Sequence, residues 1–176
     1  MHSDCSHKKT LILITITNIQ NRLLKMIEPI IEVTLNDHKF FKKTIKEISQ
    51  IINEINLKPQ TSEEKFSLLR DIIVLTYKIS VYIGVVEKHR KLEEETLYPF
   101  LEKQKYVNEA KILRRQHRKI VEYVNDMKNI IAEHRESLKP VENIAEEIIE
   151  KFVSIKTLYL KHMNLEEKLI FKILSK

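Results

Sequence analysis

Two stretches of the chain share one motif: residues 89–101 read His89-Arg-Lys-Leu-Glu93-Glu94-Glu-Thr-Leu97-Tyr98-Pro-Phe-Leu101, and residues 162–174 read His162-Met-Asn-Leu-Glu166-Glu167-Lys-Leu-Ile170-Phe171-Lys-Ile-Leu174. Each copy places a histidine four residues before a glutamate. Residues four apart lie on one face of an α-helix, one turn from each other. An imidazole and a carboxylate placed in this way can reach one metal ion, so two such helices facing each other predict a metal site inside a helical bundle.

The composition favours long helices with few turns, because the 176 residues include only one glycine and four prolines. The net charge is +6, but Lys and Glu are mixed throughout, which is typical of a solvated helical surface. Cys5 is the only cysteine, so the chain forms no intrachain disulfide and a reducing compartment fits. No stretch approaches the roughly 20 apolar residues that span a bilayer. We therefore expect a cytoplasmic protein with no membrane contact.

Apolar residues spaced by three and four predict an all-α fold, an up-down-up-down four-helix bundle with short loops. The second helix ends sooner if Pro99 stops it, and Thr61 or Ser62 caps its start. The predicted helices span residues 30–56, 62–102, 107–136 and 141–174.

The first 28 residues are predicted to lie outside this bundle. Residues 10–28 are expected to form an extra helix, and residues 1–9 to be disordered. Pro29 either stands in the first turn of the next helix or kinks a longer one. The chain is therefore divided into an N-terminal tail with an extra helix, 1–28, and the bundle, 29–176.

Each predicted helix carries one histidine on its apolar face: His38, His89, His117 and His162. At about 1.5 Å per residue, His117 lies at the depth of His162 and of Glu93, whereas His38 and His89 match less well. A single histidine on such a face is more often a core residue than a ligand. Four at similar depth, two of them beside a carboxylate that is costly to bury alone, indicate a metal site. The face predicted for the second helix also contains Phe66, Leu69, Ile73, Tyr77 and Tyr82.

The candidate ligands are nitrogen and carboxylate groups, which suit iron, manganese or zinc. Two ions fit better than one, because Glu93 and Glu166 can each bridge a pair. The Glu-x-x-His spacing of ferritin-like bundles is absent, and so is the His-Glu-x-x-His motif of zinc proteases.

Over about residues 30–174 the pattern resembles the hemerythrin-like (HHE cation-binding) domain family. The matching features are a lone histidine on the first helix, His-x-x-x-Glu-Glu-x-x-Leu-Tyr-Pro, Arg-Arg-Gln-His, and a second His-x-x-x-Glu-Glu. The resemblance implies a non-haem di-iron centre (Fe2+/Fe3+) with an oxo- or hydroxo-type bridge. It would place His38 and His89 on one iron, His117 and His162 on the other, and Glu93 and Glu166 as bridges.

The chain departs from the oxygen-carrying members of the family. They have a second histidine one turn before His117, where this chain has Leu113. With four histidines the set looks more like the iron–sulfur repair and iron-sensing proteins of the family. The missing histidine leaves open coordination positions unless water or another side chain fills them. Open positions favour reactivity with O2, H2O2 or NO over reversible carriage.

Four further residues are expected near the ligands. Tyr82 and Tyr159 lie one or two turns from a ligand on the same face, where they can donate a hydrogen bond or an electron, or are ordinary core tyrosines. Glu94 and Glu167 are expected to pair with surface Lys or Arg, or to replace a ligand.

Three functions fit these residues. The first is a di-iron protein that binds or reacts with a small oxidant and takes electrons from a donor not identified by the sequence. The second is an iron- or oxygen-sensing or iron-donating module without turnover. The third, a DNA-contacting regulator using the first 30 residues, has no helix-turn-helix signature, so no nucleic-acid partner is expected. The residues do not decide between enzyme and binding protein, or the oligomeric state.

Overall fold

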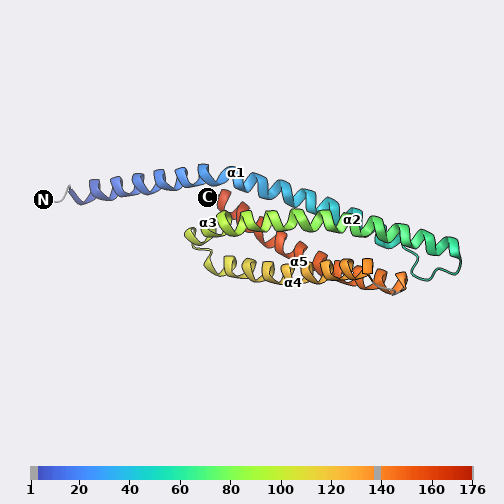
Figure 1. The fold of residues 1–176 in the computed structure, drawn as a ribbon. Helices are drawn as coiled ribbons and strands as arrows, with labels where there is room; N and C mark the ends of the chain where they lie inside the picture. The colour runs from blue at the N-terminus through green and yellow to red at the C-terminus, as the bar shows by residue number, and fades with distance from the viewer. Residues whose placement is uncertain (1–3, 137–139, 176) are drawn as a thin grey trace.

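The computed structural model describes the backbone of residues 4–136 and 140–175, and the side chains of residues 25–133 and 140–175. Four long helices form an antiparallel bundle (Figure 1): α1 (Asp4–Glu54), α2 (Ser62–Leu92), α4 (Val107–Glu136) and α5 (Val141–Leu174). A π-helix, η1 (Glu93–Leu97), and a short helix, α3 (Tyr98–Lys103), continue α2. The predicted all-α, up-down-up-down bundle is confirmed, and no strand occurs among these residues.

The prediction that residues 1–9 are disordered was wrong for residues 4–9, because one helix runs from Asp4 through Pro29 to Glu54. The helix predicted for residues 10–28 is continuous with the first bundle helix, which agrees with the longer helix that was one of the two alternatives for Pro29. Residues 1–3 lie outside the described part. Pro29 removes one backbone hydrogen bond from α1. The carbonyl of Lys25 loses its partner, and because Lys25 and Pro29 are both exposed, water can hydrogen-bond to it. Ile27 and Ile31, on either side of the proline, are buried in the core.

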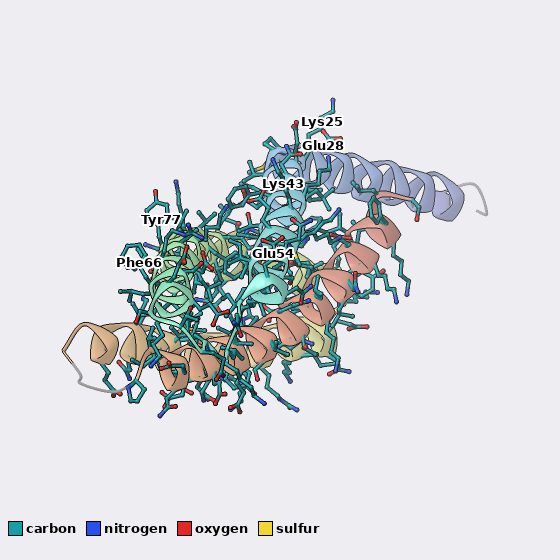
Figure 2. All side chains as sticks on the ribbon, turned by 90° about the vertical axis from the view of Figure 1, so that its right-hand side faces the viewer. Lys25, Glu28, Lys43, Glu54, Phe66 and Tyr77 are labelled. Atoms are coloured by element: carbon teal, nitrogen blue, oxygen red, sulfur yellow. The ribbon has the colours of Figure 1, made fainter. Side chains whose placement is uncertain are left out.

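The first half of α2 buries a different face from the one predicted. Phe66, Ile73 and Tyr77 are exposed, Phe66 at 71% and Tyr77 at 70%, and Figure 2 shows Phe66 and Tyr77 on the outer side of α2. Apolar residues of helical spacing occupy both faces here, so periodicity alone could not select the inner one. The buried series is Leu68, Ile72, Leu75 and Ile79.

The core consists of two apolar clusters at different depths in the bundle. The larger one is built around Phe41, Ile79 and Phe152, and the smaller one around Leu101, Leu113 and Ile170. Along each long helix or its continuation, the candidate histidine lies close to the point where one cluster gives way to the other, although Met163 of the larger cluster directly follows His162. The histidines therefore form a polar layer closed off on both sides by apolar packing.

The weak depth match between His38 and His89 is explained by the connection after α1. Residues 55–61 are not helical, and Ile55 and Leu57 pack against the larger cluster. This segment extends along the end of α2, so α2 can begin well beyond the end of α1 (Figure 1). The rings of His38 and His89 consequently lie 5.1 Å apart between centroids.

Candidate metal centre

All six predicted ligands converge in this polar layer and are buried. They form two groups in which the ligand atoms lie within 4.8 Å of one another: His38, His89, Glu93 and Glu166 in the first, and Glu93, His117 and His162 in the second. Glu93 belongs to both groups, as a bridging carboxylate would. The arrangement therefore has room for two neighbouring ions.

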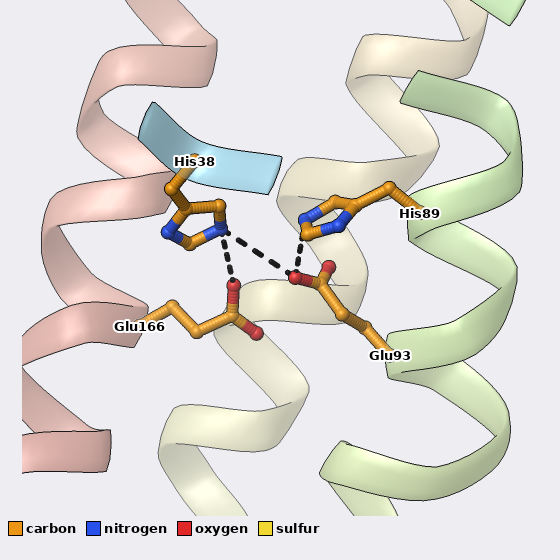
Figure 3. Close-up of side chains that lie close together, drawn as sticks. All are labelled: His38, His89, Glu93 and Glu166. Carbon is orange, nitrogen blue, oxygen red and sulfur yellow. Dashed lines mark ion pairs between the residues drawn. The ribbon is translucent and has the colours of Figure 1, made fainter. Parts of the chain in front are cut away.

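Figure 3 shows the first group, in which imidazoles from α1 and α2 face two carboxylates. His89 Nε2 lies 2.6 Å from Glu93 Oε1, and His38 Nε2 lies 3.2 Å from Glu166 Oε2 and 3.6 Å from Glu93 Oε1. In the second group, His117 Nε2 lies 3.1 Å from both His162 Nε2 and Glu93 Oε2. Glu166 Oε2 also lies 3.7 Å from His162 Nε2, which puts this carboxylate between the two groups.

The outer nitrogen of every histidine is held by an acceptor from another helix. Each Nδ1–H donates to the side chain of a residue that directly precedes or follows a candidate ligand in the sequence. The four bonds form a closed cycle around the bundle: His89 to Asp37 of α1 (3.0 Å), His117 to Glu94 of η1 (3.0 Å), His162 to Gln116 of α4 (3.2 Å), and His38 to Glu167 of α5 (3.0 Å).

These bonds decide which atoms face the centre. In a neutral ring with Nδ1 protonated, Nε2 carries the lone pair and faces inward, as in metal-bound histidines. Two lone pairs 3.1 Å apart, on His117 and His162, repel each other unless a cation or proton lies between them. Among the described residues, no hydrogen-bond partner serves Nε2 of His38 or His89, Oε1 of Glu93, or either oxygen of Glu166. Buried acceptors left without donors fit a site made for positive ions.

The ionisation of the residues without a metal supports the same conclusion. Burial alone would lower the pKa of His38, but Glu166 and Glu93 raise it to about 9. Burial lowers the pKa of His162 to about 4. Burial opposes the ionisation of both carboxyls, yet the surrounding histidines hold the pKa of Glu93 low, while burial and the charge of Glu93 raise the pKa of Glu166. Two carboxylates this close cannot both be ionised without a cation.

Glu93 begins the π-helical turn η1, which the sequence analysis did not predict. Residues five apart in an α-helix lie about 140° away from each other around the axis. In η1 the N–H of Tyr98 instead bonds to the carbonyl of Glu93, and this wider turn brings the two residues onto one face. Pro99 is the sequence signal for the turn, because its ring would clash with the carbonyl four residues earlier in a regular helix.

Tyr98 is the main residue that the sequence analysis missed at the site. Its ring is fully buried, and its hydroxyl lies 3.1 Å from His117 Nε2 and 3.3 Å from Glu93 Oε2. Burial and the charges of Glu166 and Glu93 raise the pKa of Tyr98, so the metal-free phenol keeps its proton.

The two predicted tyrosines lie farther out. Tyr82 and Tyr159 are buried beside Phe41, and the ring of Tyr159 stacks on that of His162 at 5.7 Å. Among the described residues, neither hydroxyl has a hydrogen-bond partner. A role for them beside the ligands stays a prediction.

Glu94 and Glu167 make the predicted pairs with cations, to Arg90 and Lys42 respectively. Each also orients a histidine, a role the sequence analysis did not assign. Asp37 and Gln116, which have the same role, were not considered, although each directly precedes a candidate histidine. Asp37 and Gln116 could therefore have been identified from the sequence as hydrogen-bond acceptors that stand next to a candidate ligand.

A buried layer of four histidines and two glutamates in an antiparallel four-helix bundle defines the class, a metal-binding helical-bundle protein. The family model for the hemerythrin HHE cation binding domain matches residues 75–174, more than half of the chain. The chain therefore belongs to this family, and the match includes every candidate ligand except His38. Comparison with curated proteins and with solved structures found no match. In the part of the chain that the structure describes, no helix has the length and apolar character required to cross a membrane.

Proposed function

We propose that this chain is a non-haem di-iron protein that binds or reacts with a small oxidant, O2, H2O2 or NO. The observation that carries the proposal is the pair of buried ligand groups sharing Glu93, in which inward lone pairs lack donors. His38 and His89 would hold one ion, and His117 and His162 the other, with Glu93 and Glu166 shared between them. Bound iron supplies one-electron chemistry between Fe2+ and Fe3+ and coordination positions for a small ligand.

The chain's own residues make the layer suited to this task. Apolar clusters on both sides exclude bulk water, which strengthens every electrostatic interaction in the layer. The four outer hydrogen bonds fix the ring orientations before any ion binds. The site is therefore preorganised for metal, with little rearrangement needed.

A surface hollow beside His89 offers an approach for a small molecule. Its volume is about 500 Å³, and its lining includes Asp37, Gly84, Lys88 and His89. A Cβ built on Gly84 meets no atom within 4 Å, so this glycine leaves the hollow open rather than allowing close helix packing. A diatomic molecule or peroxide that enters here reaches the Asp37–His89 pair, directly outside the first ligand group.

The test is to load the full chain with ferrous iron without oxygen and to mix it separately with O2, H2O2 and NO. We expect a spectral change with at least one of the three in the wild type. Glu93→Gln should lose iron and the change, whereas Glu122→Gln, at an exposed glutamate that pairs with Lys119 away from the hollow, should keep both. A wild-type protein that retains iron but responds to none of the three would contradict the proposal.

A further inference from the structure

Tyr98 places its hydroxyl among the ligand atoms of the second group. Its hydroxyl lies 3.1 Å from His117 Nε2 and 3.3 Å from Glu93 Oε2, and those two atoms are themselves 3.1 Å apart. The Tyr98 oxygen, His117 Nε2 and Glu93 Oε2 are therefore all within 3.3 Å of one another.

The spacing of these atoms is that of ligands around one ion. Two donor atoms each about 2.1 Å from a metal, at an angle of about 90–110°, are about 3.0–3.4 Å from each other. The three distances among Tyr98, His117 and Glu93 fall in this range, and so does the 3.1 Å between His117 Nε2 and His162 Nε2. The Tyr98 oxygen thus lies near any ion that His117 and Glu93 bind, and it also lies 3.5 Å from Nδ1 of His117, beside the imidazole ring.

Once the site is filled, the phenol loses one of its two hydrogen-bond acceptors and keeps only Glu93 Oε2. Nδ1 of His117 already donates to Glu94, so Nε2 is the nitrogen that would bind the metal. Its lone pair is then no longer available to the phenol. The position one turn before His117 is taken by Leu113, a buried residue that offers no donor atom. A further ligand from this side of the bundle has to come from another residue.

Two features of the fold favour oxygen coordination by Tyr98. The π-helical turn places residues 93 and 98 on one face, which a regular helix does not do. The guanidinium of Arg114 lies over the Tyr98 ring, 5.5 Å from its centroid, and a cation there favours negative charge on the phenol. Arg114 is itself positioned by Glu102.

We infer that Tyr98 is a metal ligand through its phenolic oxygen, on the ion held by His117, His162 and Glu93. Coordination exchanges the phenolic proton for the metal; the O–H bond breaks, the O–metal bond forms, the proton leaves to solvent, and no electron is transferred. A bound ion inverts the preference for the neutral phenol described above. This inference rests on the proposed function, because it requires the second ion to be present.

The inference makes the two ions chemically different. The first group has two histidines, whose outer acceptors Asp37 and Glu167 are both carboxylates. In the second group one outer acceptor is the neutral Gln116, and the phenolate would be an additional anionic ligand. An anionic oxygen ligand stabilises Fe3+ over Fe2+, so the second ion is expected to be the more easily oxidised of the two.

The experiment compares the oxidised, iron-loaded wild type with Tyr98→Phe, Tyr82→Phe and Tyr159→Phe. Iron content, visible absorption and resonance Raman spectra are recorded for each, with circular dichroism as the check of folding. We expect a phenolate-to-Fe3+ charge-transfer band in the wild type, with tyrosinate ring vibrations enhanced on excitation in it. Tyr98→Phe should lose the band and vibrations, and the other two variants should keep them.

The outcomes separate this inference from the proposed function. A wild type that contains two irons but shows no phenolate band overturns the inference and leaves the proposed function standing, as does a band that survives in Tyr98→Phe. A folded wild type that takes up no iron overturns both. If Tyr98→Phe does not fold, the other spectra still decide: the inference is overturned if tyrosinate vibrations are absent from the wild type or are lost in Tyr82→Phe or Tyr159→Phe.

Discussion

At the scale of residues, the histidines depend on the acceptors behind them. Asp37, Glu94, Gln116 and Glu167 each fix a histidine of another helix in the orientation that turns Nε2 inward. A carboxylate acceptor also makes the imidazole a stronger donor to a metal. We therefore expect these four residues to affect metal affinity without touching the ion.

Asp37→Asn is expected to weaken iron binding about tenfold or more. The amide is a poorer acceptor than the carboxylate for the 3.0 Å bond from His89 Nδ1, and its NH2 group can face the ring instead. Competition with a chelator measures the change. Asp71→Asn is the matched control, because Asp71 bonds to the neighbouring Arg70. An Asp37→Asn protein with wild-type affinity would show that the outer bonds are dispensable.

Most of the ligand layer could be predicted from the sequence, because helical spacing places His89 with Glu93 and His162 with Glu166 on single faces. Helical spacing also placed His38 on an apolar face, but its depth match with His89 was poor because the offset between α1 and α2 could not be predicted. Tyr98 could not be predicted from spacing. It reaches Glu93 only through the π-helical turn, whereas the sequence analysis assumed regular helices throughout.

At the scale of elements, periodicity predicted the last two helices with the bounds the structure has, residues 107–136 and 141–174. It failed where the local pattern was ambiguous. Apolar residues surround the first half of α2, so the inner face was set by neighbouring helices rather than by α2 itself. Pro29 was weighed as a helix start or a kink, and packing of the residues beside it keeps α1 continuous.

The turn between α3 and α4 stores a small backbone strain. Lys105 has φ 69°, a left-handed conformation that favours glycine. The N–H of Tyr106 bonds to the carbonyl of Leu101 and the N–H of Lys105 to that of Glu102, which terminates α3 in a Schellman motif. This turn ends the segment that carries Glu93 and Tyr98, so it helps to fix their height in the bundle.

Lys105→Gly is expected to stabilise the metal-free chain by about 0.5–1 kcal/mol, because glycine adopts this conformation without a Cβ clash. Urea unfolding followed by circular dichroism would show a higher midpoint. Lys103→Gly, at the last residue of α3, should instead destabilise the chain by about 0.5–1 kcal/mol. The account of this turn fails if the two substitutions shift the midpoint in the same direction.

At the scale of the whole molecule, the metal layer takes residues from all four long helices or their continuations. Binding to the folded state alone raises stability by mass action. Iron occupancy would thus change the free energy of unfolding of the entire bundle. The sensing or iron-donating alternative would use this change in stability. In the sensing or iron-donating alternative, the protein responds only to the amount of bound iron. In the proposed function, it also responds to O2, H2O2 or NO.

Removal of iron with a chelator is expected to lower the melting temperature of the wild type by several degrees, since a site occupied at 100 times its Kd adds about 2.7 kcal/mol. Differential scanning calorimetry before and after removal measures the shift. Glu93→Gln, which lacks the shared carboxylate, should melt at the same temperature with and without iron. An unchanged wild-type melting temperature would count against both metal-linked functions.

The division of the chain at residue 28 stays a prediction. The N-terminal part of α1 projects beyond the other helices (Figure 1), and the first described core residue is Ile27. A chain that starts at residue 25 is therefore expected to fold and to bind as much iron as the full chain. Loss of iron binding in this shortened chain, with its helix content retained, would place part of the function in the N-terminal segment.

The most direct test of the central claim is the metal content of protein purified without added metal, together with its absorption spectrum. The account predicts about two irons per chain, with near-ultraviolet oxo-to-iron charge-transfer bands. A folded sample that holds no metal or only zinc, and that cannot be reconstituted with ferrous iron, would contradict it.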